Sequence, residues 1–386
     1  MSHVVVVGAS VGGVTCVQSL RELGFDGDIT LLDAEYGPPY QRPPLSKEVL
    51  LGGDADDADL LDESALEAIG VEFRPGTPAI GLDVAGRRVR LAHGDLRFDE
   101  LVLATGGAAA VPAPLTNLIG RGAHVLRTRT DAIALAAALG PDSGLAVLGG
   151  GVLGSEIASA AVSRGVPTTL LARPAQTLGP LRGALARPLL PLHRSRGVDV
   201  QTDRTRISHG AGRWRIDAGA ARLVADVLVV AVGVRAAARW LARSLPVGPD
   251  GVRCDWRGRV APGVWAVGDI ADRAGSRHDV SYNTQAAAVV QAREVAGAIA
   301  GDPLRVPVVP YFWSDLHGVR VQAAGRIPPD ARIEPLDRDD TGAPHVFAVV
   351  DDDGTVVGAA AWGSARGFRR ARTMLGTALD QEAAAR

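Results

Sequence analysis

The stretch "VVVVGASVGGVTCVQSLREL", residues 4–23, decides the fold of this 386-residue chain. Its four β-branched valines predict a buried strand, which runs directly into a glycine-rich turn. From Val14 onward the apolar residues recur at a helical period as far as Leu23. A strand, a glycine-rich turn and a helix in this order predict a dinucleotide-binding fold, because the helix N-terminus offers free N–H groups to a pyrophosphate.

The contacts expected for this dinucleotide come from the turn and from the strand after the helix. The turn is built from four small residues: Gly8, Ser10, Gly12 and Gly13. The serine occupies the second glycine position of the fingerprint, where a side chain restricts close backbone approach. Asp33 and Glu35 follow about 20 residues beyond the turn, where an acid would hold a ribose diol. Spacing alone does not choose between these two acids.

A second stretch, "GLAVLGGGVLGSEIASAAVSRGVPTTLLAR" at residues 144–173, repeats the pattern. Its glycines satisfy the fingerprint without departure: Gly149, Gly151 and Gly154. After its second strand the expected acid is missing, because Ala172 stands there and Arg173 follows. An acid would bind the ribose 2′-OH of NAD, whereas an arginine can bind the 2′-phosphate of NADP. Arg173 therefore favours NADPH, unless it is one more solvent-facing arginine in an arginine-rich chain.

Two dinucleotide folds in one chain predict a flavin in one and a nicotinamide in the other, meeting for hydride transfer. The net charge of −2 indicates no general attraction for nucleic acid or anionic membrane. We expect no membrane span, because every stretch of membrane-spanning length contains a glycine, a proline or a charged residue. We expect no signal peptide, because the first residues contain no basic segment. Two distant cysteines, Cys16 and Cys254, predict no disulfide framework, no metal site and a cytoplasmic protein.

One further residue stands out in "YQRPPLSKEVL", residues 40–50. Lys47 is the single lysine among the 41 lysine and arginine residues of the chain. Lysine is a compact point charge, whereas arginine is a planar fork. The exception therefore indicates a position that needs one ammonium at one atom of a ligand, with chance as the alternative explanation.

The order of these motifs resembles the FAD-dependent pyridine-nucleotide oxidoreductases, in particular the ferredoxin reductases that serve cytochrome P450s and bacterial oxygenases. The matching pieces follow in the expected order: "GASVGG", "YQRPPLSKEVL", "LVLATGG", "VLRT", "LGGGVLGSE", "VVAVGV", "VWAVGDIADR" and "PYFWSD". The pieces "RPPLSK" and "FWSD" are specific to this branch, whereas the glycine motifs and "VGD" are shared by the wider superfamily.

The resemblance implies an α/β fold with two Rossmann-like, three-layer dinucleotide-binding domains, the second inserted in the first, and a small α+β C-terminal domain. The FAD-binding domain would comprise residues 1–107 and 245–309, the NAD(P)-binding domain residues 108–244, and the C-terminal domain residues 310–386. In this last domain we expect short strands around an acidic turn, followed by a helix from about Ala365.

The resemblance also implies catalytic and cofactor-binding roles. Lys47 is similar to the lysine beside the flavin N5 region, and Arg42 would contact the same cofactor. Glu156 resembles the glutamate that pairs with this lysine and approaches the nicotinamide. An ammonium there would stabilise negative charge that develops on the flavin as hydride arrives. Gly233 in "VVAVGV" is expected at the NAD(P) site.

Further FAD contacts follow from the same resemblance. Asp269 would bind the ribityl hydroxyls, and Arg127 would bind the FAD phosphates. Ala79 matches a backbone contact to the adenine, while Thr105 and Gly106 lie at the crossover loop between the domains.

The chain departs from the family pattern beneath the expected flavin. Where many relatives have "EHWxNA", this chain has "NTQAAA", which puts Gln285 at a position frequently occupied by tryptophan. An amide there could form a hydrogen bond with the pyrimidine edge of the flavin; a slip of the alignment is the alternative.

The expected partner is a ferredoxin, whose acidic surface would meet basic residues around the flavin edge. The segment "ARGFRRAR", residues 365–372, carries four arginines, and Trp313 in "FWSD" resembles an aromatic residue near the flavin and partner face. Two other functions remain: a stand-alone flavoenzyme that acts on a small molecule, and a non-catalytic flavoprotein whose redox state controls an interaction. The sequence does not indicate the oligomeric state.

Overall fold

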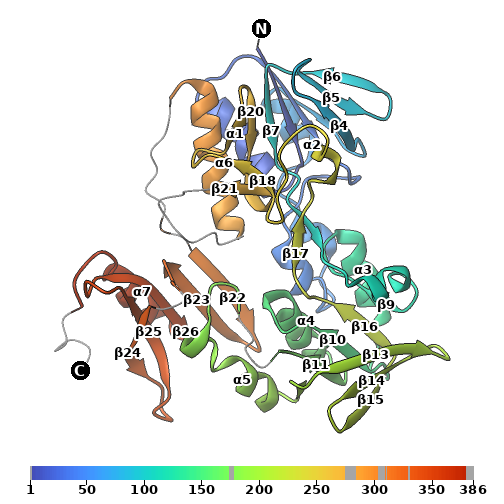
Figure 1. Ribbon diagram of the computed structural model, residues 1–386, viewed down its shortest axis with the longest axis vertical. Helices are drawn as coiled ribbons and strands as arrows, with labels where there is room; N and C mark the ends of the chain where they lie inside the picture. Colours follow the sequence, from blue (N-terminus) through green and yellow to red (C-terminus); the bar gives the residue numbers. More distant parts are fainter. Residues whose placement is uncertain are drawn as a thin grey trace. The chain divides into compact units, whose positions relative to one another are not determined.

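The computed structural model describes residues 2–173, 178–273, 284–302, 309, 311–328 and 331–379 (Figure 1). The chain packs into two compact units, and neither is continuous in sequence. The first unit comprises Met1–Arg42, Ala58–Ala108 and Val234–Val308, and the second Pro43–Asp57, Ala109–Gly233 and Val309–Arg386. These units describe packing; the domain boundaries expected from sequence stay predictions.

The first unit is built on a six-stranded sheet in the order β19-β20-β7-β1-β2-β3. All neighbouring pairs are parallel except the edge pair β19–β20. The strands are β1 (His3–Val7), β2 (Asp28–Leu32), β3 (Val71–Arg74), β7 (Glu100–Leu103), β19 (Arg259–Ala261) and β20 (Val264–Ala266). Because β20 pairs with β7 across more than 150 residues of sequence, the chain leaves this sheet and returns to it.

Alternating valines of β1 account for the layers on both faces of this sheet. Val4 and Val6 pack in a core with α1 (Val11–Glu22) and α6 (Gln285–Ala300), which lie side by side in Figure 1. Val5 and Val7 face a second core. That second core includes residues of a three-stranded antiparallel sheet, β4 (Ala79–Asp83), β5 (Arg88–Leu91) and β6 (Gly94–Arg97). Such alternation along one strand buries the sheet on both faces.

The second unit contains a five-stranded parallel sheet in the order β12-β11-β10-β16-β9. Its strands are β9 (Ala123–His124), β10 (Leu145–Leu148), β11 (Thr168–Leu171), β12 (Asp199–Gln201) and β16 (Val227–Val230). Its helices are α3 (Arg129–Ala138), α4 (Val152–Ser163) and α5 (Leu189–Ser195), and an antiparallel sheet of β13 (Thr205–Gly210), β14 (Arg213–Ala218) and β15 (Ala221–Ala225) packs in the same unit. All these strands fall between β7 and β20, so the second dinucleotide fold is inserted in the first, as predicted.

The last part of the second unit is a five-stranded antiparallel sheet in the order β22-β23-β26-β25-β24. Its strands are β22 (Tyr311–Leu316), β23 (Val319–Gly325), β24 (Arg332–Arg338), β25 (Pro344–Val350) and β26 (Val356–Trp362). The helix α7 (Ala365–Thr373) covers one face with Phe368 and Ala371, and its start at Ala365 agrees with the sequence prediction. The other face joins a core with residues 178–189, which lead into the start of α5. We refer to residues 311–379 as the C-terminal module.

Across the part of the chain that the structure describes, no helix is both long and apolar enough to cross a bilayer. This agrees with the expectation that the chain has no spanning helix.

A pair of histidines joins the C-terminal module to α5. His193 of α5 is fully buried, and its Nδ1 lies 2.9 Å from Nε2 of His317 in the turn between β22 and β23. The backbone N–H of His317 donates to Ser159 Oγ on α4 at 2.7 Å. His317 and Gly318 both have positive φ, +53° and +79°, which suits a two-residue hairpin turn. The turn is therefore tied to two helices of its unit.

This histidine pair should make stability depend on pH. Burial, reinforced by the charge of His317, lowers the pKa of His193 from 6.5 to about 4, and burial with the charge of Arg196 lowers the pKa of His317 to about 4. Below pH 6.5 the unfolded chain therefore binds more protons than the folded one. Stability should fall between pH 6.5 and 4, for His193 by at most about 3 kcal/mol at roughly 1.4 kcal/mol per pKa unit.

Urea unfolding at pH 7, 5.5 and 4.5 measures this effect. The variant His193→Leu should lose part of the pH dependence in that window, because it removes one of the two protonation sites. An unchanged slope in the variant would contradict the assignment to this pair.

Candidate functional site

Backbone packing shapes the first glycine-rich turn, between β1 and α1. Gly8 has φ +110°, and a Cβ at this position would overlap the carbonyl oxygen of Ala104 at the end of β7. A Cβ at Gly13 would overlap the carbonyl oxygen of Gly8. Only glycine therefore allows α1 to start this close to the strand ends, which leaves the helix N-terminus open for a phosphate.

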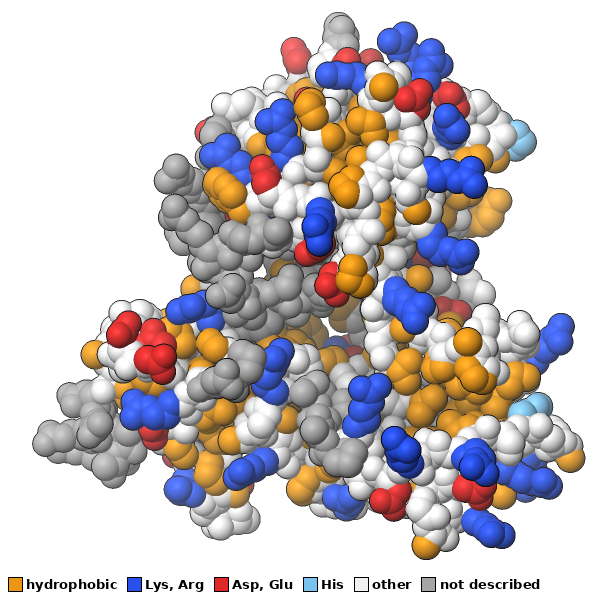
Figure 2. Space-filling view, in the orientation of Figure 1, with side chains coloured by type: hydrophobic (Ala, Val, Ile, Leu, Met, Phe, Trp, Pro, Cys, Tyr) orange, Lys and Arg blue, Asp and Glu red, His pale blue; other side chains and the backbone are white. Residues whose placement is uncertain are grey.

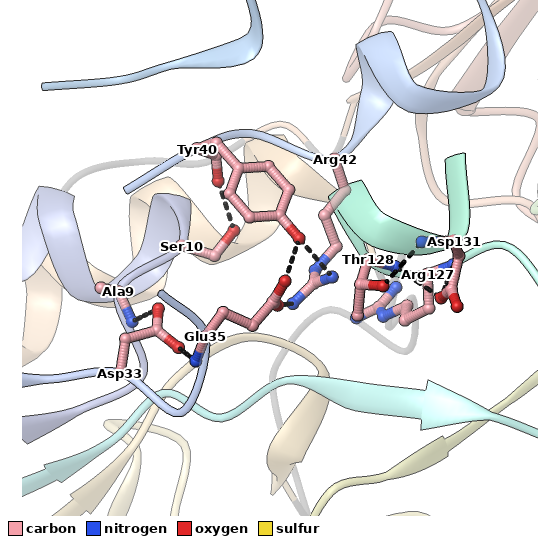
Figure 3. Close-up of polar contacts among 9 residues, drawn as sticks. All are labelled: Ala9, Ser10, Asp33, Glu35, Tyr40, Arg42, Arg127, Thr128 and Asp131. Atoms are coloured by element: carbon pink, nitrogen blue, oxygen red, sulfur yellow. Dashed lines mark hydrogen bonds and ion pairs between the residues drawn. The ribbon is translucent and has the colours of Figure 1, made fainter. Parts of the chain in front are cut away.

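The structure separates the two acids that spacing could not distinguish (Figure 3). Asp33 follows β2 directly, and its carboxylate accepts the N–H of Ala9 and the N–H of Glu35, both at 3.0 Å. Glu35 lies outside this turn, where its carboxylate accepts the hydroxyl of Tyr40 at 2.8 Å and lies 3.5 Å from the guanidinium of Arg42. Asp33 thus holds the backbone of the glycine-rich turn, whereas the half-buried Glu35 contacts the side chains of Tyr40 and Arg42.

The second position of the fingerprint has its own contact. The hydroxyl of Ser10 donates to the carbonyl of Tyr40 at 3.1 Å, so the side chain points to the loop after β2 (Figure 3). Gly12, the next glycine, is different from Gly13: a Cβ there would make only ordinary contacts, the nearest at 3.4 Å to Val267. The hydrogen bond from Ser10 to Tyr40 accommodates the serine side chain and links the turn to the loop that carries Glu35.

The remaining residues predicted for the first unit lie on several elements. Thr105 donates its hydroxyl to the carbonyl of Ala237 at 3.1 Å, and Gly106 follows with φ +63°. Asp269 lies in a short 3-10 turn that begins at Gly268, and Gln285 opens α6. The sixteen-residue α6 is capped by the hydroxyl of Thr284, and the amide of Gln285 donates to Gln41 Oε1 at 2.9 Å. Ala79, at the start of β4, is half-buried.

The second glycine-rich turn repeats the packing of the first. Gly149 has φ +109°, and a Cβ there would overlap the carbonyl oxygen of Ala231. A Cβ at Gly154 would overlap the carbonyl oxygen of Gly149, and Gly151 is the N-cap of α4. Gly233, which follows β16, has φ +125°, and its carbonyl accepts the N–H of Ala110 at 2.9 Å.

The position expected to select the nucleotide follows β11. Ala172 is buried and donates its N–H to the carbonyl of Gln201, whereas Arg173 is exposed. An exposed cation where NAD-binding folds carry an acid fits the predicted preference for a 2′-phosphate. The four residues that follow it lie outside the described part of the chain.

A buried carboxylate occupies the centre of the second unit. Glu156, on the first turns of α4, is paired with Lys47, whose Nζ lies 3.1 Å from its Oε1. Ser314 of β22 donates its hydroxyl to the same oxygen at 2.6 Å, and Ser46 donates to Oε2 at 2.5 Å. We call these four residues the carboxylate cluster. The lysine–glutamate pair implied by the resemblance is present, and the two serines are partners that the sequence analysis missed.

An aromatic residue packs on this cluster. The Nζ of Lys47 lies 4.3 Å from the ring centroid of Trp313, and the guanidinium carbon of Arg320 lies 5.0 Å from the same ring. Arg320 is in turn held by Asp315 through two contacts of 2.8 and 2.7 Å. Trp313 therefore has two cations near its ring while it stays partly exposed.

The segment that carries Lys47 is fastened to the second unit at further points. The guanidinium of Arg164, at the end of α4, donates to the carbonyl of Leu50 at 2.9 Å and to the carbonyls of Ala136 and Leu139 at the end of α3. Arg129 of α3 forms an ion pair with Asp56 at 2.6 Å. These contacts explain why residues 43–57 pack with the inserted fold.

Arg127 stands just before α3 in the same unit. Its N–H donates to the carboxylate of Asp131, which also accepts the N–H of Thr128 and so completes a capping box at the helix start (Figure 3). The backbone at Arg127 is therefore well defined.

Neither cysteine is placed for thiol chemistry. Burial raises the pKa of Cys16 to about 12 and that of Cys254 to about 11. Both side chains are buried, so they are protonated thiols at neutral pH and lack the thiolate that such chemistry requires.

The predicted residues thus fall into two sets, each defined within its own unit. The first unit holds Gly8, Ser10, Gly12, Gly13, Asp33, Glu35, Arg42, Ala79, Thr105, Gly106, Asp269 and Gln285, and the second holds Lys47, Arg127, Gly149, Gly151, Gly154, Glu156, Arg173, Gly233 and Trp313. Tyr40, Ser46 and Ser314 are the polar partners that sequence reasoning did not single out. All three stand beside predicted residues in the quoted motifs, which is the only signal that could have found them.

Comparison with known proteins gives two family matches. Residues 2–292 match the family model described as pyridine nucleotide-disulphide oxidoreductase, and residues 311–385 match the one described as reductase C-terminal.

Individual relatives agree with both matches. The chain is 36% identical to a probable ferredoxin reductase, CtmF, of Castellaniella defragrans, over 85% of this chain and 83% of that protein. It is 32% identical to the ferredoxin–NAD(+) reductase component of the biphenyl dioxygenase system of Paraburkholderia xenovorans, over 98% and 94%. Among solved structures, putidaredoxin reductase in its covalent complex with putidaredoxin superposes with a TM-score of 0.86 at 26% identity, over 97% of this chain and 92% of that one.

We call each glycine-rich turn, together with the helix N-terminus that follows it, a glycine cradle. The adjacent residues Gly12 and Gly13 allow the packing of the first cradle to be tested by matched substitutions. Gly13→Ala should lower the free energy of unfolding by about 2 kcal/mol or more, because the new methyl group meets backbone that cannot move aside. Gly12→Ala should leave stability unchanged or raise it slightly, since alanine is favoured over glycine in a helix. Thermal unfolding and the flavin content of the purified variants measure both effects; equal losses in the two variants would contradict the packing argument.

Proposed function

Because this chain belongs to the pyridine nucleotide-disulphide oxidoreductase family, we propose that it is a FAD-dependent NAD(P)H:ferredoxin reductase. It would take hydride from NAD(P)H onto FAD and pass single electrons to a ferredoxin that serves a cytochrome P450 or an oxygenase. The observation that carries this proposal is the pair of glycine cradles, one in each unit, together with a single lysine held against a buried glutamate.

The residues of the first unit fit FAD. The backbone of Gly8 and Gly13 leaves the N-terminus of α1 free for the pyrophosphate, as a Cβ would not. Glu35 is the acid that supports a ribose contact best, because the partners of its carboxylate are side chains, whereas the carboxylate of Asp33 holds two backbone N–H groups of the turn. Arg42 lies beside Glu35, and its guanidinium would contact the same cofactor.

We assign further FAD contacts by the same resemblance. Asp269 would bind the ribityl hydroxyls, Arg127 the phosphates, and the backbone of Ala79 the adenine. Thr105 and Gly106 would line the crossover. The side-chain amide of Gln285 donates one N–H to Gln41. Its second N–H and its carbonyl oxygen would form hydrogen bonds with the flavin edge.

The second glycine cradle fits a nicotinamide dinucleotide. Gly149, Gly151 and Gly154 would receive its pyrophosphate at the N-terminus of α4, with Gly233 after the neighbouring strand β16. Arg173 would bind the 2′-phosphate of NADPH. The biphenyl dioxygenase relative is described with NAD(+), so the proposed preference for NADPH rests on Arg173 of this chain alone.

FAD supplies the chemistry that converts a two-electron hydride into two single electrons. The role of the protein's own residues is to supply charge and to hold groups in position. Lys47 would hold a positive charge at the flavin ring and stabilise the negative charge that develops there. Glu156 fixes the position of this ammonium, and the ring of Trp313 limits the access of water to it. Both groups act without forming a bond to the substrate.

The ferredoxin partner is supported by charge on α7. Arg366, Arg369, Arg370 and Arg372 are all exposed, because Gly367, Phe368 and Ala371 face the sheet. On the face drawn in Figure 2, basic side chains of each unit lie among acidic and apolar ones. An acidic protein would be attracted to the arginines of α7, and its encounter rate should fall with salt. We also propose a cytoplasmic location, where reduced nicotinamide nucleotides are formed and used.

The first experiment is anaerobic mixing of the purified protein with NADPH and with NADH, followed by flavin absorbance. Rapid bleaching establishes hydride transfer, and its absence contradicts the proposed activity. Ferredoxin-dependent reduction of cytochrome c then tests the acceptor. Bleaching with no transfer to any acidic ferredoxin would favour the stand-alone flavoenzyme, for which the unusual Gln285 is the supporting feature.

Nucleotide preference gives a prediction for Arg173. Arg173→Ala should raise the KM for NADPH about tenfold or more, because hydrogen bonds to a charged group contribute about 1.5–3 kcal/mol. The KM for NADH should change less than about twofold, since NADH lacks the phosphate. Equal changes for both nucleotides would remove the assigned role.

Lys47 gives a second prediction. Lys47→Arg should retain FAD but reduce it at least about tenfold more slowly, because a planar fork cannot occupy the position of the compact ammonium between Glu156 and Trp313. Stopped-flow measurement at saturating nucleotide gives the rate. A variant that is reduced at the wild-type rate would show that a positive charge of any shape is sufficient.

A further inference from the structure

The carboxylate cluster contains more hydrogen-bond donors than an ion pair needs. Glu156 is 6% exposed, Ser46 is 3% exposed and Ser314 is fully buried. A buried carboxylate is stable only if donors satisfy its oxygens. Here Lys47 supplies one donor and the two hydroxyls supply two more.

The four residues of the carboxylate cluster come from three distant parts of the sequence. Ser46 and Lys47 belong to the segment that packs on α4, Glu156 to α4 itself, and Ser314 to the first strand of the C-terminal module. Each hydroxyl reaches a different carboxylate oxygen, Oε2 for Ser46 and Oε1 for Ser314. The two hydroxyls therefore fix the carboxylate plane at both oxygens, independently of the contact with the ammonium.

We infer that Ser46 and Ser314 are positioning residues for Lys47, acting through Glu156. The two hydroxyls hold the carboxylate in one rotamer, and the carboxylate holds the ammonium at 3.1 Å and over the ring of Trp313. Through Ser314 the C-terminal module contributes directly to the geometry of the reducing centre. This inference rests on the proposed function for its kinetic consequence, but the arrangement of the cluster can be measured independently.

The composition of the chain makes that measurement unusually direct. Because Lys47 is the only lysine, a holoenzyme labelled with 15Nζ-lysine gives one ammonium resonance. We expect Ser314→Ala and Ser46→Ala each to shift this resonance and to accelerate exchange of its protons with water about tenfold, since the ammonium loses its fixed acceptor. Ser163→Ala is the matched control: this serine is also on α4, but its hydroxyl donates to the carbonyl of Ser159. The control should leave the resonance unchanged.

A double-mutant cycle separates positioning from general packing. Ser314→Ala should slow flavin reduction about tenfold in the wild-type background, with the KM for nucleotide unchanged, and less than about twofold in a Glu156→Gln background. Tenfold corresponds to about 1.4 kcal/mol. An equal slowing in both backgrounds, or a lysine resonance that neither serine variant alters, would overturn the inference. If neither nucleotide reduces the wild-type flavin, the proposed function fails, and the resonance alone decides whether the serines position Lys47.

Discussion

The second unit depends on the satisfaction of one buried carboxylate. Glu156 is buried on α4, so its charge must be balanced and its oxygens must accept hydrogen bonds. The segment around Lys47, α4 and β22 can form this cluster only when all three are packed together. Removing one partner would leave an uncompensated charge, which costs more than the pair contributes. The cluster therefore couples the C-terminal module to the inserted fold.

The two glycine cradles impose a different and more local constraint. In each, the third glycine of the fingerprint lies against the carbonyl of the first, and the first lies against the end of a neighbouring strand. This packing brings the helix N-terminus close to the strand ends and leaves its N–H groups unpaired within the helix. The same geometry thus stabilises the strand–helix connection and creates the phosphate site. The same two close approaches recur in both turns: Gly13 lies against Gly8 and Gly8 against Ala104, and likewise Gly154 lies against Gly149 and Gly149 against Ala231.

Local patterns therefore allowed most of the fold to be predicted from sequence. The valine run, both cradles, the inserted order and the helix at Ala365 follow from neighbouring residues or from motif order. The different partners of Asp33 and Glu35 could not be predicted in this way, because they depend on which backbone N–H groups turn toward each carboxylate. The serines of the carboxylate cluster escaped for a related reason: a hydroxyl 110 or 158 residues from its acceptor leaves no periodic signal. Likewise, the packing of residues 43–57 with the inserted fold follows from contacts of Arg129 and Arg164 that sequence order conceals.

The contrast between Lys47 and Arg42 explains why the chain uses lysine once. Arg42 lies near two oxygens, the hydroxyl of Tyr40 and the carboxylate of Glu35, both at 3.5 Å, and a planar fork suits such a pair of acceptors. The Nζ of Lys47 lies 3.1 Å from one carboxylate oxygen of Glu156 and 4.3 Å from the ring centroid of Trp313. A guanidinium would have to offer several coplanar N–H groups to a carboxylate whose two oxygens already accept Ser314 and Ser46, and some of these N–H groups would remain without acceptors. In a chain that otherwise uses arginine for every cation, the shape of this site therefore selects lysine.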